Sequence, residues 1–212
     1  MWCTRLIPIT TDTIRYQIVL FIKEVVYLKS KSMIRGTIMR RLIFLLSIIF
    51  MNLSQLSHAE AKNLQAYIDN PEVVGEARLK MFFFKIYDAS LIAQNGVFVD
   101  DQPFALKLKY LRDFDGKDIA SRSIDEMRKQ GMEDEVKLAK WFQQMKLLFP
   151  NVKEGQTITG IVDANQVSHF YFDSQHLGKV EDKEFSKWFF NIWLAENTSQ
   201  PDMRLALIGK SK

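Results

Sequence analysis

The sequence predicts an α+β domain in which helices are layered on one face of an antiparallel sheet. Three observations lead to this prediction: runs with strand periodicity come first, two segments with helical periodicity follow, and further strands and a helix complete the chain. The strands are separated by short turn signals of the hairpin type, which favour antiparallel pairing. With 47% hydrophobic residues, the 212-residue chain can build a sizeable core.

The segment from Met39 to Ala59 has the layout of a secretory signal peptide. Two arginines precede an apolar block at 42–51, and small residues follow at 57–59. The block is about half as long as the roughly 20 residues of a membrane-spanning helix. We therefore expect cleavage near Ala59 or Ala61 and a periplasmic or secreted protein whose mature chain has no transmembrane span. A buried N-terminal helix is the alternative.

A signal peptide should begin close to the true N-terminus, so residues 1–38 do not fit an exported protein. We interpret them as a non-native upstream extension, with translation beginning at Met39. The expected organisation is the extension at 1–38, the signal peptide at 39–59 and a single domain at 62–210.

Removing the leader reverses the sign of the net charge. Residues 1–59 hold eight of the 29 Lys/Arg and two of the 25 Asp/Glu, so the remainder carries 21 basic and 23 acidic residues and is near −2 rather than +4. No Lys/Arg cluster in it resembles a phosphate-tracking groove, and we expect no nucleic-acid partner. The only cysteine is Cys3, so the predicted mature chain has no disulfide and no thiolate metal site.

The first predicted sheet segment, 73–92, is rich in Val, Phe, Ile and Tyr and lacks proline after position 71. It predicts one long strand or two strands joined by a bend. Its three consecutive phenylalanines, Phe82 to Phe84, are typical of a strand covered on both faces, or mark a bend where the faces exchange.

Turn signals at 95–96 and 101–103 separate this segment from the next strand, 104–111. There, apolar residues alternate with lysines over part of the run, which predicts one face on the core. The core-facing residues are expected to be Phe104, Leu106, Leu108 and Tyr110.

Two helices are predicted next. The first spans 117–131, with Asp115 as its N-cap and Gly131 as its C-terminal stop. The second follows acidic residues at 133–135 and ends before Pro150. Its apolar stripe at helical spacing consists of Leu138, Trp141, Phe142, Met145, Leu148 and Phe149.

The last third of the chain returns to strands and ends in helices. Residues 155–172 predict two strands around a hairpin at 164–165, and 176–180 predict a third short strand. A helix is expected at 182–194, with an apolar stripe of Phe185, Trp188, Phe189, Ile192 and Trp193. Pro201 is expected to open a short terminal helix.

Signature motifs of familiar enzymes are missing from the sequence. His169 and His176 lack the spacing of a metal pair, so we interpret them as ordinary surface or hairpin histidines and expect no metal and no cofactor. What remains is a set of cationic and phenolic groups beside apolar strands: Arg78, Lys80, Lys85, Tyr87, Tyr110, Arg112 and Arg122. In an apolar cleft, arginine can bind a carboxylate or enolate bidentately and tyrosine can add a hydrogen bond. The alternative for each is a solvated cation, or a tyrosine ring in the core with its hydroxyl at the rim.

Four stretches together resemble the chalcone isomerase-like family, most closely its exported bacterial branch. They are VGEARLKMFFFKIYDASL, LKLKYLRDFDGKDIASRSIDEM, GQTITGIV and KWFFNIWLAENTSQPDMRLALIG. The resemblance covers nearly the whole predicted mature chain and implies an open-faced β-sandwich with a ligand cleft between the sheet and the helices. Plant enzymes of the family cyclise a chalcone to a flavanone, and plastid relatives bind fatty acids through an arginine and a tyrosine.

Matching positions to the plant enzymes implies that most of their active-site groups are replaced here. The enzyme's helical tyrosine, lysine and asparagine correspond to Ile119, Arg122 and Glu126. Its two threonines correspond to Ile192 and Tyr87, and its arginine to Arg78. Flavanone synthesis is therefore not expected, whereas an arginine and a tyrosine remain as in the ligand-binding relatives.

The spacing of Arg78 and Tyr87 is odd, which would place them on opposite faces of an unbroken strand. They can share one cleft only if a bulge or bend intervenes, and the run 81–84 is where the pattern could shift. If it does not, Arg112 or Arg122 becomes the better cation. The full set of expected ligand-binding residues is Arg78, Tyr87, Tyr110, Arg112, Ile119, Arg122 and Ile192.

Three functions remain open from the sequence. The leading hypothesis is an exported, non-catalytic binder of a small amphipathic ligand such as a fatty acid. The second is an isomerase or lyase acting on an enone or phenol, with Arg78 stabilising an oxyanion and Tyr87 exchanging a proton. The third is a structural envelope protein whose cleft is filled by its own side chains. The sequence does not predict an oligomeric state.

Overall fold

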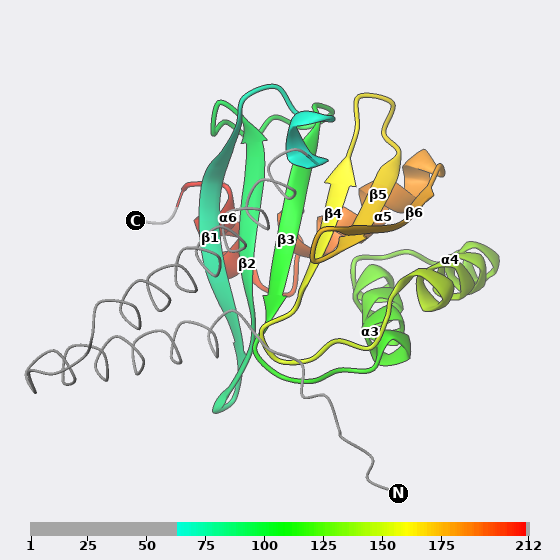
Figure 1. The fold of residues 1–212 in the computed structure, drawn as a ribbon. Coiled ribbons are helices and arrows are strands. Elements are labelled where there is room, and N and C mark those ends of the chain that lie inside the picture. Colours follow the sequence, from blue (N-terminus) through cyan, green and yellow to red (C-terminus); the bar gives the residue numbers. More distant parts are fainter. Residues whose placement is uncertain (1–62, 211–212) are drawn as a thin grey trace, which may run out of the picture. The chain divides into compact units, whose positions relative to one another are not determined.

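Six strands form one antiparallel sheet in the computed structural model, which describes residues 63–210 (Figure 1). Each strand pairs with the next along the chain, so the order in the sheet is β1-β2-β3-β4-β5-β6. The strands are β1 (Pro71–Met81), β2 (Phe84–Gln94), β3 (Phe104–Tyr110), β4 (Thr157–Val162), β5 (Ser168–Phe172) and β6 (Gln175–Val180). The expected extension at 1–38 and signal peptide at 39–59 lie outside the described residues.

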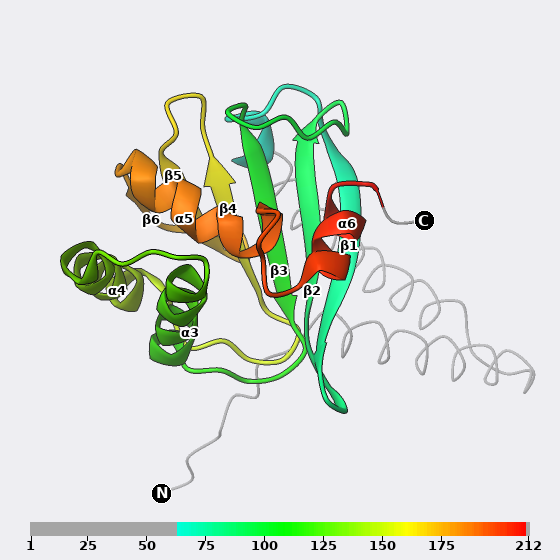
Figure 2. The ribbon, with the colours of Figure 1, turned by 180° about the vertical axis from the view of Figure 1, so that it is seen from behind.

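Four helices pack against one face of this sheet, which confirms the predicted α+β architecture (Figure 2). They are α3 (Gly116–Lys129), α4 (Glu135–Leu148), α5 (Lys183–Leu194) and α6 (Pro201–Leu207). Two of them begin with an aspartate that accepts hydrogen bonds from the first turn: Asp134 caps α4 and Asp182 caps α5. Among the described residues, no helix is long and apolar enough to cross a membrane.

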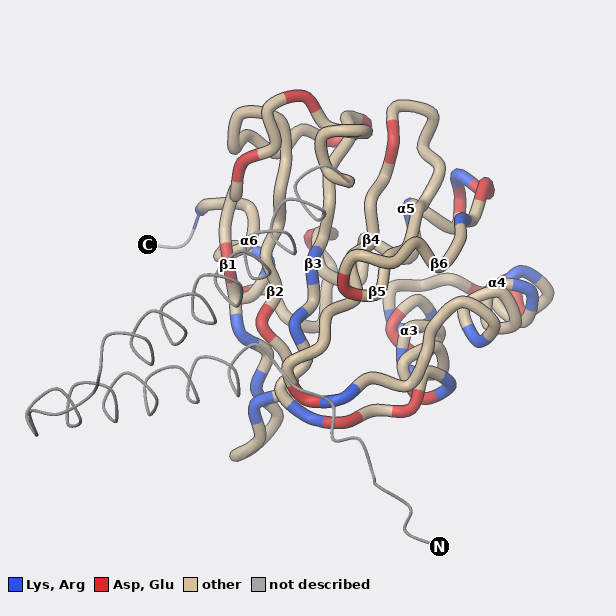
Figure 3. Tube along the Cα trace, in the orientation of Figure 1, with Lys and Arg blue, Asp and Glu red and all other residues tan. Residues whose placement is uncertain are grey.

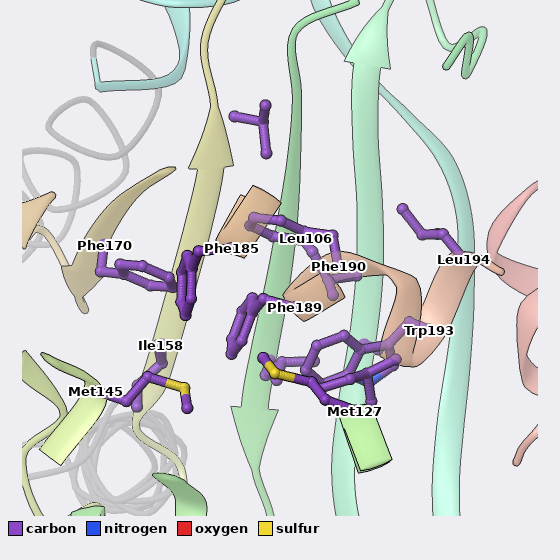
Figure 4. Close-up of a cluster of buried hydrophobic side chains, with 14 of the residues drawn as sticks. Leu106, Met127, Met145, Ile158, Phe170, Phe185, Phe189, Phe190, Trp193 and Leu194 are labelled. Atoms are coloured by element: carbon purple, nitrogen blue, oxygen red, sulfur yellow. The ribbon is translucent and has the colours of Figure 1, made fainter. Parts of the chain in front are cut away.

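The main core lies between the sheet and the helices (Figure 4). Alternate residues of the strands, such as Leu91 and Leu106, meet the aromatic stripe of α5, where Phe189 stacks on Phe185. In α4, Trp141 is fully buried, as its place in the predicted stripe requires. The alternation of β3 and the helical period of α4 and α5 therefore place their apolar residues on the core side as predicted.

A smaller apolar cluster covers part of the opposite sheet face. Ile68, in the segment before β1, packs on Ile92, Ala105, Ile161 and Tyr171, which belong to β2–β5. The sheet is therefore backed by helices on one face and by a short N-terminal segment over part of the other.

The three consecutive phenylalanines do not form a covered strand. Phe82 and Phe83 are the two loop residues of a hairpin, because Met81 of β1 pairs with Phe84 of β2. Both ring systems are exposed to solvent. The expectation of a strand between two apolar layers is wrong here, and the alternative of two strands joined by a bend is correct.

Glycine at position 75 lets α6 approach the edge of the sheet. A Cβ at Gly75 would lie 2.1 Å from the carbonyl oxygen of Ala206 and 2.6 Å from that of Leu207. The β1–β2 register also shifts between Val73 and Gly75. Backbone contact of this kind requires glycine, so Gly75 sets how closely α6 covers β1.

Candidate functional site

Two tyrosines lie side by side on the sheet face that carries the helices. Tyr87 of β2 and Tyr110 of β3 are direct partners in the strand register, and their rings meet edge to face with centroids 6.0 Å apart. Tyr110 is buried, whereas Tyr87 is partly buried. Burial raises the pKa of Tyr110, so its hydroxyl is a neutral donor at physiological pH.

Helix α5, which packs on the sheet, holds the Tyr87 hydroxyl in place through Trp193. The indole Nε1 of Trp193 donates a hydrogen bond of 2.9 Å to the Tyr87 oxygen. Burial raises the pKa of Tyr87 to about 12; the Trp193 bond and the charge of Arg122 oppose this shift, and the charge of Glu126 adds to it. Tyr87 is thus protonated near neutral pH. Within the described residues its own O–H proton has no acceptor.

Charged groups from α3 lie next to this pair. The Glu126 carboxylate is buried and forms ion pairs with Arg122, at 2.5 Å, and Lys129, at 3.0 Å. Burial favours its neutral form, but a hydrogen bond from Ser199 and the two cations outweigh burial and lower the pKa of Glu126. The cluster therefore holds one carboxylate against two cations, near the Tyr87 phenol and the apolar core.

Arg78 does not join this site. It pairs in register with Asp88, and the two side chains form a bidentate ion pair, with Arg78 Nη2 2.8 Å from Asp88 Oδ2. The carboxylate raises the pKa of Arg78, and the hydrogen bond from Arg78 lowers the pKa of Asp88. Tyr87 instead pairs with Leu79.

The bulge that would have brought Arg78 and Tyr87 together does not do so. A register shift does occur, between Leu79 and Lys80, but it lies on the hairpin side of the Arg78–Asp88 pair and leaves Arg78 facing away from the helices. The condition for these two residues to share one cleft is therefore not met, and Asp88 lies with Arg78 on the other face.

The remaining expected residues divide between the site and the surface. Ile192 is buried in the main core and Ile119 packs against it. Arg122, on α3, is close enough to Tyr87 for its charge to oppose the raised pKa of that phenol. Arg112 instead lies just after β3, exposed, with its guanidinium 4.3 Å from the centre of the Phe84 ring. Of the two fallback cations, the structure thus places Arg122 near Tyr87.

The two histidines lie on the opposite sheet face, and one belongs to a hydrogen-bonded chain. His169 Nε2 lies 3.0 Å from Asp163 Oδ2, and His169 Nδ1 lies 3.4 Å from the Tyr67 hydroxyl. The Tyr67 hydroxyl in turn lies 3.1 Å from that of Tyr171. His169 is thus a partly buried structural residue rather than an ordinary surface one, and it ties the N-terminal segment to β5. His176 is exposed and packs against Tyr171.

Sequence reasoning missed the roles of Trp193, Glu126 and Ser199. Trp193 was part of an aromatic stripe, and periodicity does not show which way an indole N–H points. Arg122 and Glu126 are four residues apart on a predicted helix, a spacing that could have indicated an ion pair. Nothing local to Ser199 indicates its hydrogen bond, because it follows α5 and reaches α3 only in the folded chain.

Comparisons with known proteins agree with this fold. The family model described as chalcone isomerase-like matches residues 74–209. An uncharacterized protein of Haemophilus influenzae is 25% identical over 140 residues, which cover 66% of this chain and 68% of that protein. The crystal structure of a fatty-acid binding protein of Arabidopsis thaliana is similar with a TM-score of 0.52 and 11% identity, over 66% of this chain and 88% of that one. At this identity the likeness to the plant structure shows the fold alone.

Proposed function

The chain belongs to the chalcone isomerase-like family, and on that premise we propose that it is a non-catalytic binder of a small amphipathic ligand such as a fatty acid. The polar head of the ligand would lie at Tyr87 and its apolar part between the sheet and the helices. The observation that carries the proposal is the Trp193–Tyr87 hydrogen bond, because it fixes a phenol at the edge of an apolar core with its proton left to donate.

The two phenols suit an oxygen-rich headgroup. Tyr87 and Tyr110 are both held protonated by burial, so each offers an O–H donor at neutral pH. Hydrogen bonds from neutral donors to a carboxylate are among the stronger ones, worth about 1.5–3 kcal/mol each. A few placed polar groups beside an apolar surface are typical of small-molecule sites.

Arg122 is the cation that a carboxylate would use in this site. It already pairs with Glu126, which Lys129 also contacts, so a second carboxylate could approach without leaving Glu126 unpaired. The solved relative with the same fold is described as a fatty-acid binding protein, which supports an acid as the ligand class.

The site offers less to the isomerase or lyase alternative. A proton-transferring tyrosine works best with a pKa near the operating pH, whereas burial raises the pKa of Tyr87 to about 12. Arg78, the expected oxyanion partner, faces away and is held by Asp88. The third alternative is a structural protein whose own side chains fill the cleft between the sheet and the helices. It differs from the proposal because it predicts that no ligand binds.

Export remains part of the proposal. It rests on the signal-peptide layout at 39–59, with cleavage near Ala59 or Ala61. Mass-spectrometric mapping of the natural N-terminus tests it, and a stable chain that begins near Met1 would contradict it.

Native mass spectrometry of the purified full chain tests ligand binding. We expect one additional mass per chain that is lost on organic extraction, with an amphipathic acid in the extract. The variant Tyr87→Phe should lose most of this mass, whereas Tyr171→Phe, on the opposite sheet face, should keep it. An unliganded protein that also fails to bind added decanoate would support the filled interface instead, and turnover of an enone that Tyr87→Phe abolishes would support the enzyme.

A further inference from the structure

The hairpin between β1 and β2 ends in exposed apolar side chains. Phe83 is 100% exposed and Phe82 is 93% exposed, and the flanking Phe84 and Met81 are 55% and 42% exposed. We call Met81–Phe84 the aromatic tip. Figures 1 and 2 both show the hairpin extending beyond the remainder of the described chain, so the tip is free to meet a surface.

The local backbone does not account for phenylalanine at this place. Phe82 has φ of 54°, in the left-handed region that disfavours bulky residues. Two-residue hairpin loops favour Gly, Asn or Asp at such positions. Since neither Phe82 nor Phe83 contributes to the core, folding alone would be served better by a polar turn.

Basic residues surround the base of the aromatic tip. Lys80 and Lys85 face each other across the two strands, in the pair next to Met81 and Phe84. The Arg112 guanidinium lies over the Phe84 ring at 4.3 Å. Further along the hairpin, Asp88 neutralises Arg78, so these three cations dominate the charge next to the tip. Figure 3 shows blue segments between an uncharged tip, which points downward in this view, and the rest of the sheet.

The size of the apolar surface limits what can cover it. An aromatic side chain buries about 150–250 Å², so the tip offers on the order of 500 Å². A stable protein interface takes about 800 Å² from each partner. A lipid bilayer needs no matching surface, and aromatic residues beside Lys and Arg are the composition that lies at its interface.

We propose that the aromatic tip inserts into the headgroup region of an anionic lipid bilayer, with Lys80, Lys85 and Arg112 contacting the lipid headgroups. Phe82 and Phe83 enter the boundary between headgroups and acyl chains. The lysine stems lie along the apolar surface while their ammonium groups remain at the phosphates. This role is additional to ligand binding at Tyr87 and does not depend on it.

Flotation of the full chain with vesicles measures the effect of the tip. We expect binding to phosphatidylglycerol-containing vesicles, weakened about tenfold or more in the double variant Phe82→Ser/Phe83→Ser. The matched control Val136→Ser/Leu147→Ser removes two apolar side chains of α4 that are also highly exposed, at 82% and 86%, and should leave partition unchanged. Residues 1–62 are common to all variants, so the difference reports on the tip.

The lysines are tested in the same assay. Lys80→Gln/Lys85→Gln should weaken binding to phosphatidylglycerol vesicles by about tenfold or more, while binding to pure phosphatidylcholine vesicles changes little. Raising the salt concentration should reduce the same preference, because the contact is electrostatic and exposed.

A local probe shows whether the tip itself enters the bilayer. The fluorescence of the indole introduced by Phe83→Trp should be quenched by lipids brominated about 5–10 Å below the headgroups. The fluorescence of the indole introduced by Leu147→Trp should not be quenched. Equal quenching of the two, or unchanged partition of Phe82→Ser/Phe83→Ser, would overturn the proposal. A third outcome would also overturn it: the wild type self-associates, Phe82→Ser/Phe83→Ser is monomeric, and the two bind vesicles equally. A second copy of the chain would then be the partner of the tip.

Discussion

The indole Nε1 of Trp193 on α5 donates a 2.9 Å hydrogen bond to the Tyr87 hydroxyl on β2. The bond joins the helix layer to the sheet where the apolar core meets the charged cluster of Glu126. It fixes the direction of the phenol and uses the phenol oxygen as acceptor, so the phenol proton is left for a ligand. The proposed function rests on this pair.

Double-mutant analysis should show that these two residues are coupled. Tyr87→Phe leaves the indole N–H without its partner and should lower the free energy of unfolding by about 1–3 kcal/mol. In the background of Trp193→Phe, the same change should cost about 1 kcal/mol less. Urea denaturation of the four proteins measures this, and strictly additive effects would show that the hydrogen bond contributes nothing.

Replacing Glu126 should favour an acidic ligand. Glu126→Gln removes the negative charge that competes for Arg122, so the affinity for decanoate should rise on the order of fivefold, while that for decanol should stay the same. Asp125→Asn is the matched control, because it removes an equal charge from the neighbouring, exposed position. If the two variants behave alike, only net charge matters and Arg122 does not contact the headgroup.

Acid should destabilise the fold partly through Asp182. Partial burial favours the neutral form of its carboxyl, but hydrogen bonds from the Trp141 indole and from two backbone N–H groups of α5, with the charge of Lys140, lower its pKa. The unfolded chain therefore binds more protons below about pH 4, and stability is lost as pH falls through the lowered pKa.

Asp182→Asn tests this dependence because it keeps the shape of the cap and removes its titration. It should be less stable than the wild type at pH 7, by about 1 kcal/mol, and this difference should shrink toward pH 2. Thermal unfolding across this range measures it, with Asp100→Asn as a surface control. A constant difference at all pH values would remove Asp182 from the acid response.

Gly75→Ala should separate α6 from the edge of the sheet. The added methyl group would meet the Ala206 carbonyl oxygen at 2.1 Å, and overpacking of this kind costs about 1–3 kcal/mol. Val73→Ala, at an exposed position on the same strand, should have a much smaller effect. Hydrogen exchange should show faster opening of α6 in the glycine variant, and unchanged protection would contradict the close contact.

Hydrophobic periodicity predicted the fold where one face of an element is buried. The stripe of Leu138, Trp141 and Met145 and the alternation of β3 both depend on burial against a single layer, so their patterns are regular. The hairpin at Phe82 and Phe83 was predicted only as an alternative to a covered strand, because it lacks the Asn or Gly that normally marks such a turn. Apolar residues there suggest burial, whereas the structure exposes them.

The candidate site could be predicted only in part. Tyr87 and Tyr110 were expected from their residue types and from their place beside apolar strands, and the register sets them side by side. The cation could not be chosen from sequence, because it depended on whether a bulge between Arg78 and Tyr87 brings them to one face. Trp193 and Ser199 join the site through contacts between distant segments, and local patterns do not contain that information.

Calorimetric titration of decanoate into the full chain and its Tyr87→Phe variant tests the proposed function most directly. The account predicts one binding site per chain, with affinity lowered about tenfold or more in Tyr87→Phe and unchanged in Tyr171→Phe. Circular dichroism of both variants verifies that each is folded. Absence of binding to the wild type, or equal affinity of the wild type and Tyr87→Phe, would contradict a headgroup site at the Tyr87–Trp193 pair.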